Sequence, residues 1–262
     1  MTFDLVVATI GRVQELERLL GSLERQTHKD FRVLIVDQND DDRLEPVLQT
    51  HASLDVERLR APSGLSRARN IALPHVGADL IAFPDDDCVY ADDLLGRVAR
   101  RFGEEPGLGG LTGRAPDSAS WKHEAAALTR ENLWNRAISF TIFLRRTVVE
   151  RVGQFDEALG LPSSSGEEID YLIRAIDQGV RIEYDPSFLV AHNQKPDADA
   201  FGAREGASLG YLLRKHGYPK ATVARMLIRP AGGVVVALAH RDRRRARFQL
   251  DTLQGRLRGY CS

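Results

Sequence analysis

The chain has 262 residues, of which 28% are charged, and a formal net charge of −1. This length allows one elaborated domain or a domain with an appendage, and we expect the second. Cys88 and Cys261 lie far apart without companion spacing, which argues against a disulfide framework or a zinc site and favours a reducing compartment. The first residues lack the basic and apolar segments of a signal peptide, so we expect a cytoplasmic protein.

Charge is distributed unevenly along the chain. Residues 203–262 carry thirteen Lys/Arg and three acids, a net charge of +10, so the remainder carries −11. A basic tail indicates an anionic partner, and we expect an anionic acceptor or the anionic inner face of the plasma membrane. Nucleic acid is not expected, because Arg243–Arg245 is short and lacks interleaved aromatic residues. The longest apolar stretch, 231–239, is shorter than the roughly 20 residues of a membrane-spanning helix, so we expect peripheral association.

Apolar runs and amphipathic segments alternate through the first half of the chain. We expect strands at 5–9, 33–36, 56–59, 80–83 and 108–113, and helices at 13–23, 44–48, 63–71 and 92–102. The glycines at 108–113 would let a backbone or a ligand approach closely. Strands that alternate with helices form right-handed crossovers. The sequence therefore predicts an α/β fold with a mostly parallel sheet and helices on both faces.

The second half of the chain is less regular. We expect helices at 124–136, 146–152 and 167–178, a strand at 139–144, and a strand pair at 181–184 and 188–191. The serine-rich loop 162–166 precedes the third of these helices. Beyond Pro196 the pattern is helical, with breaks at Pro219 and Pro230. The sequence thus predicts an α/β domain over residues 1–198 and a basic helical C-terminal extension over residues 199–262.

Carboxylates follow two of the predicted strands, Asp37 after one and the run Asp85, Asp86 and Asp87 after another. In an open α/β sheet the ligand crevice lies outside the carboxyl ends of the strands. In an extended segment Asp85 and Asp87 share one side, and two carboxylates at this spacing suit Mg²⁺ or Mn²⁺ that also holds a diphosphate. His192, at the end of a later strand, is a candidate third ligand. The alternatives are a helix N-cap with solvated acids and a hydrogen-bonded structural histidine.

Two further groups have a functional and a structural interpretation. Arg67 and Arg69 lie near a helix start, where free amides and guanidinium groups suit phosphate, although a solvated helix face explains them equally well. Glu167 and Glu168 open a helix, where the macrodipole favours acids. A glutamate on a flexible loop is also how a general base is presented to a substrate.

In chain order these motifs resemble glycosyltransferase family 2, whose members are inverting enzymes of the GT-A (Rossmann-like) fold. The resemblance covers residues 3–193 and rests on Val6–Arg12, Val36–Asp40, Arg67–Asn70, Phe83–Asp87, Gly166–Arg174 and Val190–His192. It implies transfer of a sugar from a nucleotide-diphosphate sugar, of the UDP type, to an acceptor hydroxyl with inversion. It also implies a saccharide or lipid-linked acceptor, in the synthesis of cell-surface polysaccharide or glycolipid.

The resemblance also implies roles for individual residues. Glu168 stands where the family has its base, and Glu167 is second. The nucleotide-sugar-binding residues would be Thr9, Asp37, Asn39, Arg67, Arg69, Asn70, Asp85 and Asp86, and the metal ligands Asp85, Asp87 and His192. Gln38 replaces the second aspartate of the family's second-strand motif.

Two other functions remain open at this stage, a nucleotidyltransferase that forms a sugar nucleotide and a non-catalytic nucleotide-sugar-binding protein. Nucleotidyltransferases usually carry a glycine-rich basic loop after the first strand, and Thr9–Val13 is a poor version of it. A non-catalytic binding protein would not need the acidic residues Glu167, Glu168 and Asp170, so their presence favours an enzyme.

Overall fold

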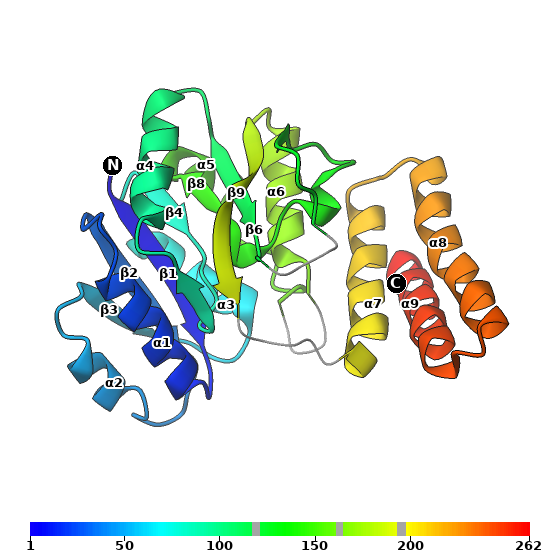
Figure 1. Ribbon diagram of the computed structural model, residues 1–262, viewed down its shortest axis with the longest axis horizontal. Coiled ribbons are helices and arrows are strands. Elements are labelled where there is room, and N and C mark those ends of the chain that lie inside the picture. Colours follow the sequence, from blue (N-terminus) through cyan, green and yellow to red (C-terminus); the bar gives the residue numbers. More distant parts are fainter. Residues whose placement is uncertain (117–120, 161–164, 193–197) are drawn as a thin grey trace. The chain divides into compact units, whose positions relative to one another are not determined.

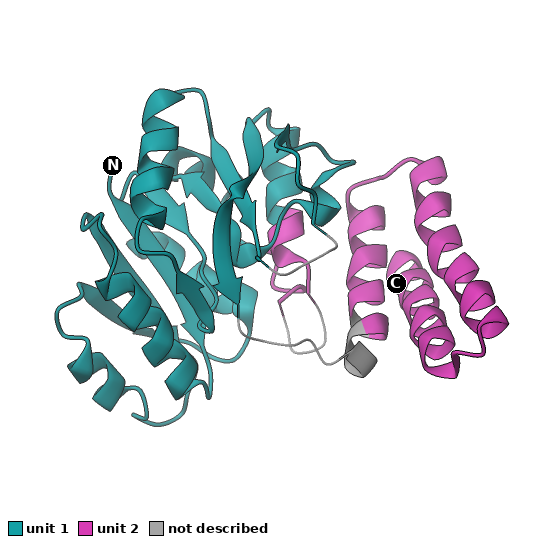
Figure 2. Ribbon diagram, in the orientation of Figure 1, with its two compact units in different colours: residues 1–155, 171–194 teal, residues 156–170, 195–262 magenta. Residues whose placement is uncertain are grey.

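The computed structural model describes residues 1–116, 121–160, 165–192 and 198–262, so most of the serine-rich loop and Pro196 lie outside the described residues. The chain divides into two compact units (Figure 2): unit 1 comprises residues 1–155 and 171–194, and unit 2 residues 156–170 and 195–262. The structure thus groups a segment from the middle of the chain with the helical tail. The sequence-based division at 198/199 stays a prediction.

Unit 1 is built on a mixed sheet (Figure 1) whose described strands have the order β3-β2-β1-β4-β8-β6-β9-β5, with β7 paired to β9. The first four strands in this order are mutually parallel, whereas β8 runs antiparallel to both of its neighbours. The strands are β1 (Phe3–Thr9), β2 (Phe31–Asp37), β3 (Val56–Arg60), β4 (Leu80–Ala82), β5 (Cys88–Tyr90), β6 (Gly110–Arg114), β7 (Ala126–Ala127), β8 (Phe143–Arg145) and β9 (Ile182–His192).

The helices between these strands confirm the predicted α/β alternation, within a few residues at their ends. They are α1 (Val13–Glu24), α2 (Glu45–Thr50), α3 (Leu65–Ala72), α4 (Leu94–Glu104), α5 (Arg146–Val152) and α6 (Glu167–Asp177). The first turn of α6 is grouped with unit 2 and the rest of it with unit 1.

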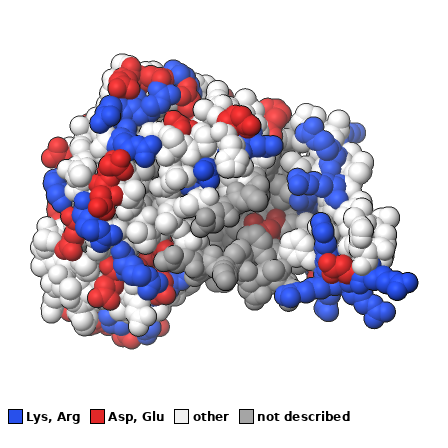
Figure 3. Space-filling model, in the orientation of Figure 1, with Lys and Arg blue, Asp and Glu red and all other residues white. Residues whose placement is uncertain are grey.

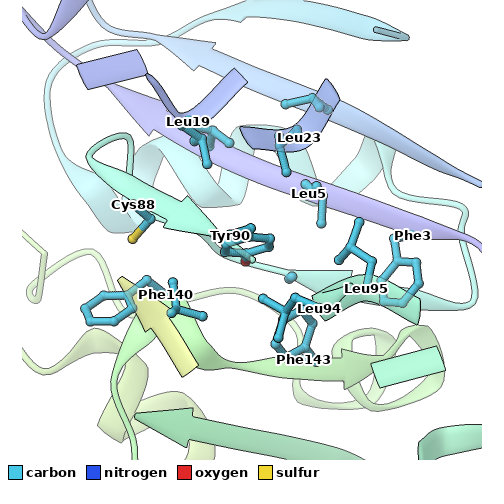
Figure 4. Packing of buried hydrophobic residues seen from close by; sticks show 14 of the residues in the cluster. Phe3, Leu5, Leu19, Leu23, Cys88, Tyr90, Leu94, Leu95, Phe140 and Phe143 are labelled. Atoms are coloured by element: carbon cyan, nitrogen blue, oxygen red, sulfur yellow. The ribbon is translucent and has the colours of Figure 1, made fainter. Parts of the chain in front are cut away.

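The core of unit 1 follows from alternation along the buried strands. Phe3, Leu5 and Val7 of β1 face one side of the sheet and join a cluster with the leucines of α1 and with Tyr90. Figure 4 shows Leu5, Leu19, Leu23 and Tyr90 in this cluster. Residues of the opposite parity, such as Val6, are also buried, and α3 packs against β1 and β2. Both faces of the sheet are therefore covered, so functional side chains can reach solvent only at the ends of the strands.

Three predicted elements differ in the structure. The segment 124–136 contains the short strand β7 and the 3₁₀ turn Leu133–Asn135 instead of a helix, because β7 bonds to β9. The predicted strand 139–144 begins as the 3₁₀ turn Ser139–Thr141, and only then does β8 follow. The predicted strand pair is one continuous strand, β9, whose pairing with β6 shifts register between Thr112 and Arg114.

Glycine in β6 permits a close approach, as the sequence predicts. A Cβ on Gly113 would lie 2.0 Å from the carbonyl oxygen of Phe188 in β9. Only glycine fits beside the neighbouring backbone at this point.

Unit 2 consists mainly of three helices, α7 (Ala198–Lys215), α8 (Lys220–Ala239) and α9 (Arg243–Cys261). Pro219 precedes α8, as predicted, but α8 continues through Pro230, so the predicted break there is wrong. Proline at 230 cannot donate to the carbonyl of Met226, four residues earlier. The guanidinium of Arg256 in α9 donates to that carbonyl instead. A long-range contact thus compensates for the hydrogen bond that the proline removes.

The continuous α8 also changes the expectation about membranes. Among the described residues, α8 is one helix whose length and apolar composition would suffice to cross a bilayer. The apolar stretch 231–239 is shorter than this helix, because the sequence predicts a break at Pro230 and the helix continues through it. Length and composition are the only support for a spanning role.

Candidate active site

Several polar residues meet where the parallel strands of unit 1 end. Strand β1 pairs in parallel with β2 and β4, and Thr9 lies directly opposite Asp37 in the register. The segment Asp85–Asp87 follows β4 and leads into β5. The carboxyl ends of three parallel strands therefore meet at one edge, which is where ligands bind in open α/β sheets.

Asp86 is held by β1 and the residues that follow it. The Thr9 hydroxyl donates to Asp86 Oδ2 at 2.7 Å, and Arg12 Nη1 donates to Oδ1 at 2.8 Å. Asp86 is almost completely buried. Burial raises the pKa of Asp86, and the hydrogen bonds from Thr9 and Arg12 offset only part of this effect. Both carboxylate oxygens of Asp86 therefore have partners from the first strand and the turn after it.

Asp85 and Asp87 both approach His192. His192 Nε2 lies 2.9 Å from Asp87 Oδ1 and 3.9 Å from Asp85 Oδ2. The antiparallel register of β5 with β9 places His192 opposite Cys88 and so explains the approach across a hundred residues of sequence. The ring of His192 stacks on Phe140 at 4.7 Å between centroids.

The protonation equilibria of Asp87 and His192 are coupled. Burial acts to raise the pKa of Asp87, but the hydrogen bond and charge of His192, together with Arg12, outweigh burial and lower it. Burial acts to lower the pKa of His192, but its interactions with Asp87 and Asp85 outweigh burial and raise it. The geometry thus favours an ionised Asp87 beside a histidine that binds protons more strongly than usual.

The donor atoms fit a divalent cation. Ligand atoms of Asp87, Cys88 and His192 lie within 4.8 Å of one another. Asp87 Oδ1 is buried and faces His192 Nε2 at 2.9 Å. Burial raises the pKa of the Cys88 thiol, so this thiol does not supply a thiolate. Two carboxylates and an imidazole, from Asp85, Asp87 and His192, form a donor set suited to Mg²⁺ or Mn²⁺.

Asp37 at the end of β2 lies in a network of its own. Its carboxylate accepts from the Asn39 main chain at 2.9 Å and from Arg58 at 2.6 Å, and Arg60 lies 3.1 Å away. Burial would raise the pKa of Asp37, but these partners outweigh it and lower the pKa. Asn39 Oδ1 accepts from the main chain of Gly11 at 2.7 Å. Asp37 and Asn39 therefore join the loop after β2 to the loop after β1.

The α3 residues take different positions. The Arg69 side chain is buried, contacts the rings of Phe83 and Phe155, and lies 3.6 Å from Asp85. Asn70 exchanges two hydrogen bonds with the main chain of Phe155, at 3.0 and 2.7 Å. Arg67 is half-buried. The structure therefore brings Arg69 close to the acidic run, and it uses the Asn70 amide to fix the segment around Phe155.

The candidate bases belong to unit 2. In the first turn of α6 Glu167 is buried and Glu168 is partly exposed. Asp170 in the same turn is fully buried and accepts from Lys215 Nζ at 2.6 Å and from His216 Nε2 at 2.9 Å. Lys215 also binds Asp156 at 2.6 Å. These contacts connect the start of α6 to α7 within unit 2.

Sequence reasoning missed some residues of the strand-end site. Arg12 contacts two of the three aspartates, and its position three residues after Thr9 in the first motif could have indicated it. Arg58 and Arg60 contact Asp37, and their two-residue spacing on one strand face could have identified them as a pair. Ser139 donates to Asp85 at 3.1 Å. Nothing in the sequence pattern pointed to this serine, which lies in a 3₁₀ turn.

Solved structures of other proteins have the same fold. The mannosyltransferase PcManGT from Pyrobaculum calidifontis, solved with GDP-Man and Mn²⁺, is similar with a TM-score of 0.69 and 16% identity, over 98% of this chain and 86% of that chain. S. aureus TarS residues 1–349, solved with UDP-GlcNAc, is similar with a TM-score of 0.67 and 16% identity, over 97% and 92% of the two chains. Together with the strand-end site, they define the fold class, a GT-A glycosyltransferase fold.

Sequence comparison then gives the family. The model of "Glycosyl transferase family 2" matches residues 4–154, more than half of the chain, and the chain belongs to this family. This confirms the predicted family and the transferase class.

Two curated relatives agree with the family assignment. The pre-mycofactocin glycosyltransferase of Mycobacterium tuberculosis is 28% identical over 88% of this chain and 51% of its own length. The succinoglycan biosynthesis protein ExoM of Rhizobium meliloti is 25% identical over 88% of this chain and 77% of its own length. The chain thus spans about half the length of the first of these relatives.

Proposed function

We propose that this protein transfers a sugar from a nucleotide-diphosphate sugar, of the UDP type, to an acceptor hydroxyl with inversion at the anomeric carbon. The acceptor is a saccharide or a lipid-linked acceptor in cell-surface polysaccharide or glycolipid synthesis, at the inner face of the plasma membrane. The convergence of Asp85, Asp87 and His192 beside the strand ends, in a chain of this family, is the observation that carries the proposal.

Each group at the strand ends has a role in this mechanism. Asp85, Asp87 and His192 would hold a Mg²⁺ or Mn²⁺ ion, and such an ion, when bound, supplies Lewis-acid neutralisation of the diphosphate leaving group. Arg69, already 3.6 Å from Asp85, adds positive charge beside the same group. Thr9 and Arg12 fix Asp86 and thereby the direction of its two neighbours. Asp37 and Asn39 order the two loops that we assign to the nucleoside.

The base is Glu168 in this proposal, and Glu167 is the second candidate. A base that takes the proton of an attacking hydroxyl must meet the acceptor, and Glu168 is the more exposed of the two. Asp170 is less suited, because its buried carboxylate already accepts from Lys215 and His216.

The test is a transfer assay with UDP- and GDP-sugars, with Mn²⁺ and with excess EDTA, followed by NMR of the anomeric configuration in the product. We expect an inverted product, dependence on the metal, and loss of about 10²- to 10⁴-fold in kcat for Glu168→Gln with unchanged donor binding. Glu104→Gln, an exposed glutamate of α4, is the control. Retained anomeric configuration would refute inversion, full turnover in EDTA would refute metal dependence, and a fully active Glu168→Gln would refute Glu168 as the base. Release of pyrophosphate from a nucleoside triphosphate would identify a nucleotidyltransferase, and binding without turnover a non-catalytic protein.

A further inference from the structure

Helix α8 in unit 2 leaves large apolar side chains in solvent. Ile228, Val235, Val236 and Leu238 are 67%, 67%, 51% and 59% exposed. A soluble helix normally exposes polar residues and buries its apolar stripe. In α8 the second half, from Pro230 to Ala239, has no polar side chain on any side.

Apart from Lys220 and Leu238, which lie beside it, the exposed residues of α8 form one continuous stripe. Its members recur every three or four residues, the spacing of one helix face, and are Ala221, Ala224, Arg225, Ile228, Arg229, Gly232, Val235, Val236 and Ala239. The opposite side of α8 carries its buried residues, which recur every seven positions: Val223, Pro230 and Ala237. Helix α8 packs against α9. This stripe, which is apolar from Gly232 onward, is therefore the outer face of unit 2's own helix pair, and the inner face already has its partner.

Basic residues surround the apolar end of α8. The turn from α8 to α9 and the start of α9 carry the exposed residues Arg241, Arg243, Arg244, Arg245 and Arg247. Figure 3 shows Lys and Arg side chains gathered over this turn. The acids nearby are few: Asp242 caps α9 by accepting from the main chain of Arg245, and Asp251 lies 4.0 Å from Arg247. Helix α8 itself contains no acid.

A helix face that is apolar in its second half, with arginines before and after that half, matches one kind of surface. The headgroup region of an anionic bilayer offers negative charge outside and acyl chains just below, and interfacial helices with basic flanks bind it by both effects. A second copy of this chain would instead bring two basic surfaces together. A spanning orientation would place Arg225 and Arg229 within the hydrocarbon region, which strongly disfavours arginine.

We propose that α8 is an interfacial membrane-binding helix, which inserts Ile228, Val235, Val236 and Leu238 among the acyl chains of an anionic bilayer. The arginines of the α8–α9 turn bind the lipid phosphates. The helix lies along the surface, and α9 stays on its aqueous side because it packs against α8. This binding is independent of sugar transfer and can be measured without substrate.

Vesicle co-sedimentation of the full chain tests the charge component. Vesicles of phosphatidylcholine are compared with vesicles containing about 30 mol% phosphatidylglycerol, at about 50 mM and about 500 mM NaCl. We expect at least about tenfold tighter binding to the anionic vesicles at low salt, and loss of this preference at high salt. The variant R243Q/R244Q/R245Q loses about 100-fold in affinity. R18Q/R100Q/R151Q removes three exposed arginines of unit 1 and retains wild-type binding.

The apolar component needs a separate variant and a probe of depth. V235S/V236S/L238S changes only exposed side chains, so circular dichroism stays that of the wild type while affinity falls about tenfold or more for both vesicle types. In a Cys261→Ser background, an environment-sensitive dye on Val236→Cys shifts to the blue with anionic vesicles, whereas the same dye on Arg151→Cys does not.

Three results would overturn the proposal. The first is equal binding to neutral and anionic vesicles. The second is a dye at position 236 that stays in water while the protein is bound. The third is a dimer in light scattering that V235S/V236S/L238S dissociates, without vesicle binding by the wild type, since a second copy would then cover α8.

Discussion

The two compact units differ in what fills their interiors. In unit 1, large side chains such as Phe3, Leu19 and Tyr90 pack from helices and strands into one cluster. In unit 2, α7 and α9 meet through glycines. A Cβ on Gly259 would lie 1.9 Å from the Ala207 carbonyl oxygen, and one on Gly210 would lie 2.1 Å from that of Arg256.

This difference determines where apolar and polar groups end up. Unit 1 uses its large apolar residues inside, so polar groups gather at the strand ends, where chemistry is possible. In unit 2 the backbones of α7 and α9 touch, which small residues permit, and the large apolar residues of α8 remain outside. We infer that unit 1 is organised for a small polar ligand and unit 2 for an extended apolar surface.

The largest expected effect is on activity at the strand ends of unit 1. Asp85→Asn should lower kcat/KM by about 10²- to 10³-fold, because it removes a charge from the proposed ion site. The melting temperature should change little, because Asp85 is partly exposed and lies outside the apolar cluster. Asp92→Asn, an exposed acid paired with Arg25, is the matched control. A variant at Asp85 with wild-type kinetics would argue against a functional strand-end site.

The next effect concerns the glycine contact of unit 2. Gly259→Val should destabilise unit 2 by about 3 kcal/mol, because the new side chain meets the backbone of α7 and forces the helices apart. Urea denaturation followed by circular dichroism measures the change, while the nucleotide binding that we propose for unit 1 should persist. If Gly259→Val is as stable as the wild type, backbone contact is not what holds these helices together.

A smaller effect is expected from the buried ion pair of unit 2. Lys215→Met should cost about 2 kcal/mol in the free energy of unfolding, because the buried carboxylate of Asp170 loses a charged partner. The control is Lys220→Met, an exposed lysine at the start of α8, with an effect within about 0.5 kcal/mol. Equal effects of the two variants would contradict a specific role for Lys215.

The same cluster predicts a pH dependence. Burial would raise the pKa of Asp156, but Lys215, the Ala158 amide and Tyr211 outweigh it and lower the pKa below 3.8. The stabilisation by Asp156 is therefore complete above pH 3.8 and is lost as pH falls through the folded-state value. For Lys215 burial is outweighed by Asp156 and Asp170, which raise its pKa above 10.5, so its contribution is lost as pH rises through that higher value. The free energy of unfolding, measured against pH, should converge for the wild type and Lys215→Met at low and at high pH. A constant difference between the two proteins over the whole pH range would contradict the assignment.

The smallest effect has the opposite sign. Gly232 lies inside α8, and a Cβ there would meet no atom within 4 Å. Gly232→Ala should stabilise the protein by about 0.5 to 1 kcal/mol, because alanine favours the helix and loses less backbone entropy. Thermal denaturation of Gly232→Ala and Gly259→Val, measured in parallel, distinguishes a glycine with open space around it from a glycine at a helix–helix contact. Destabilisation by Gly232→Ala would mean that α8 has a close neighbour at this position.

Some elements could be predicted because their signals are local. The apolar run of β1 and the leucines of α1 define a strand and a helix within a few residues of their observed limits. The glycines of β6 correctly indicated a close backbone approach. The segment 124–136 was wrongly predicted as helical, because its main-chain hydrogen bonds go to β9, more than 50 residues away.

The sequence by itself determined the alternation of strands and helices in unit 1, the family, and the acidic run beside an apolar strand. These features depend on periodicity and on short motifs, which neighbouring residues determine. Only the tertiary structure decided that Arg12 and Ser139 contact the aspartates, that Arg256 replaces the hydrogen bond lost at Pro230, and that α8 turns its apolar face outward. Each of these features depends on contacts between residues far apart in the chain, and local patterns carry no information about which distant groups meet.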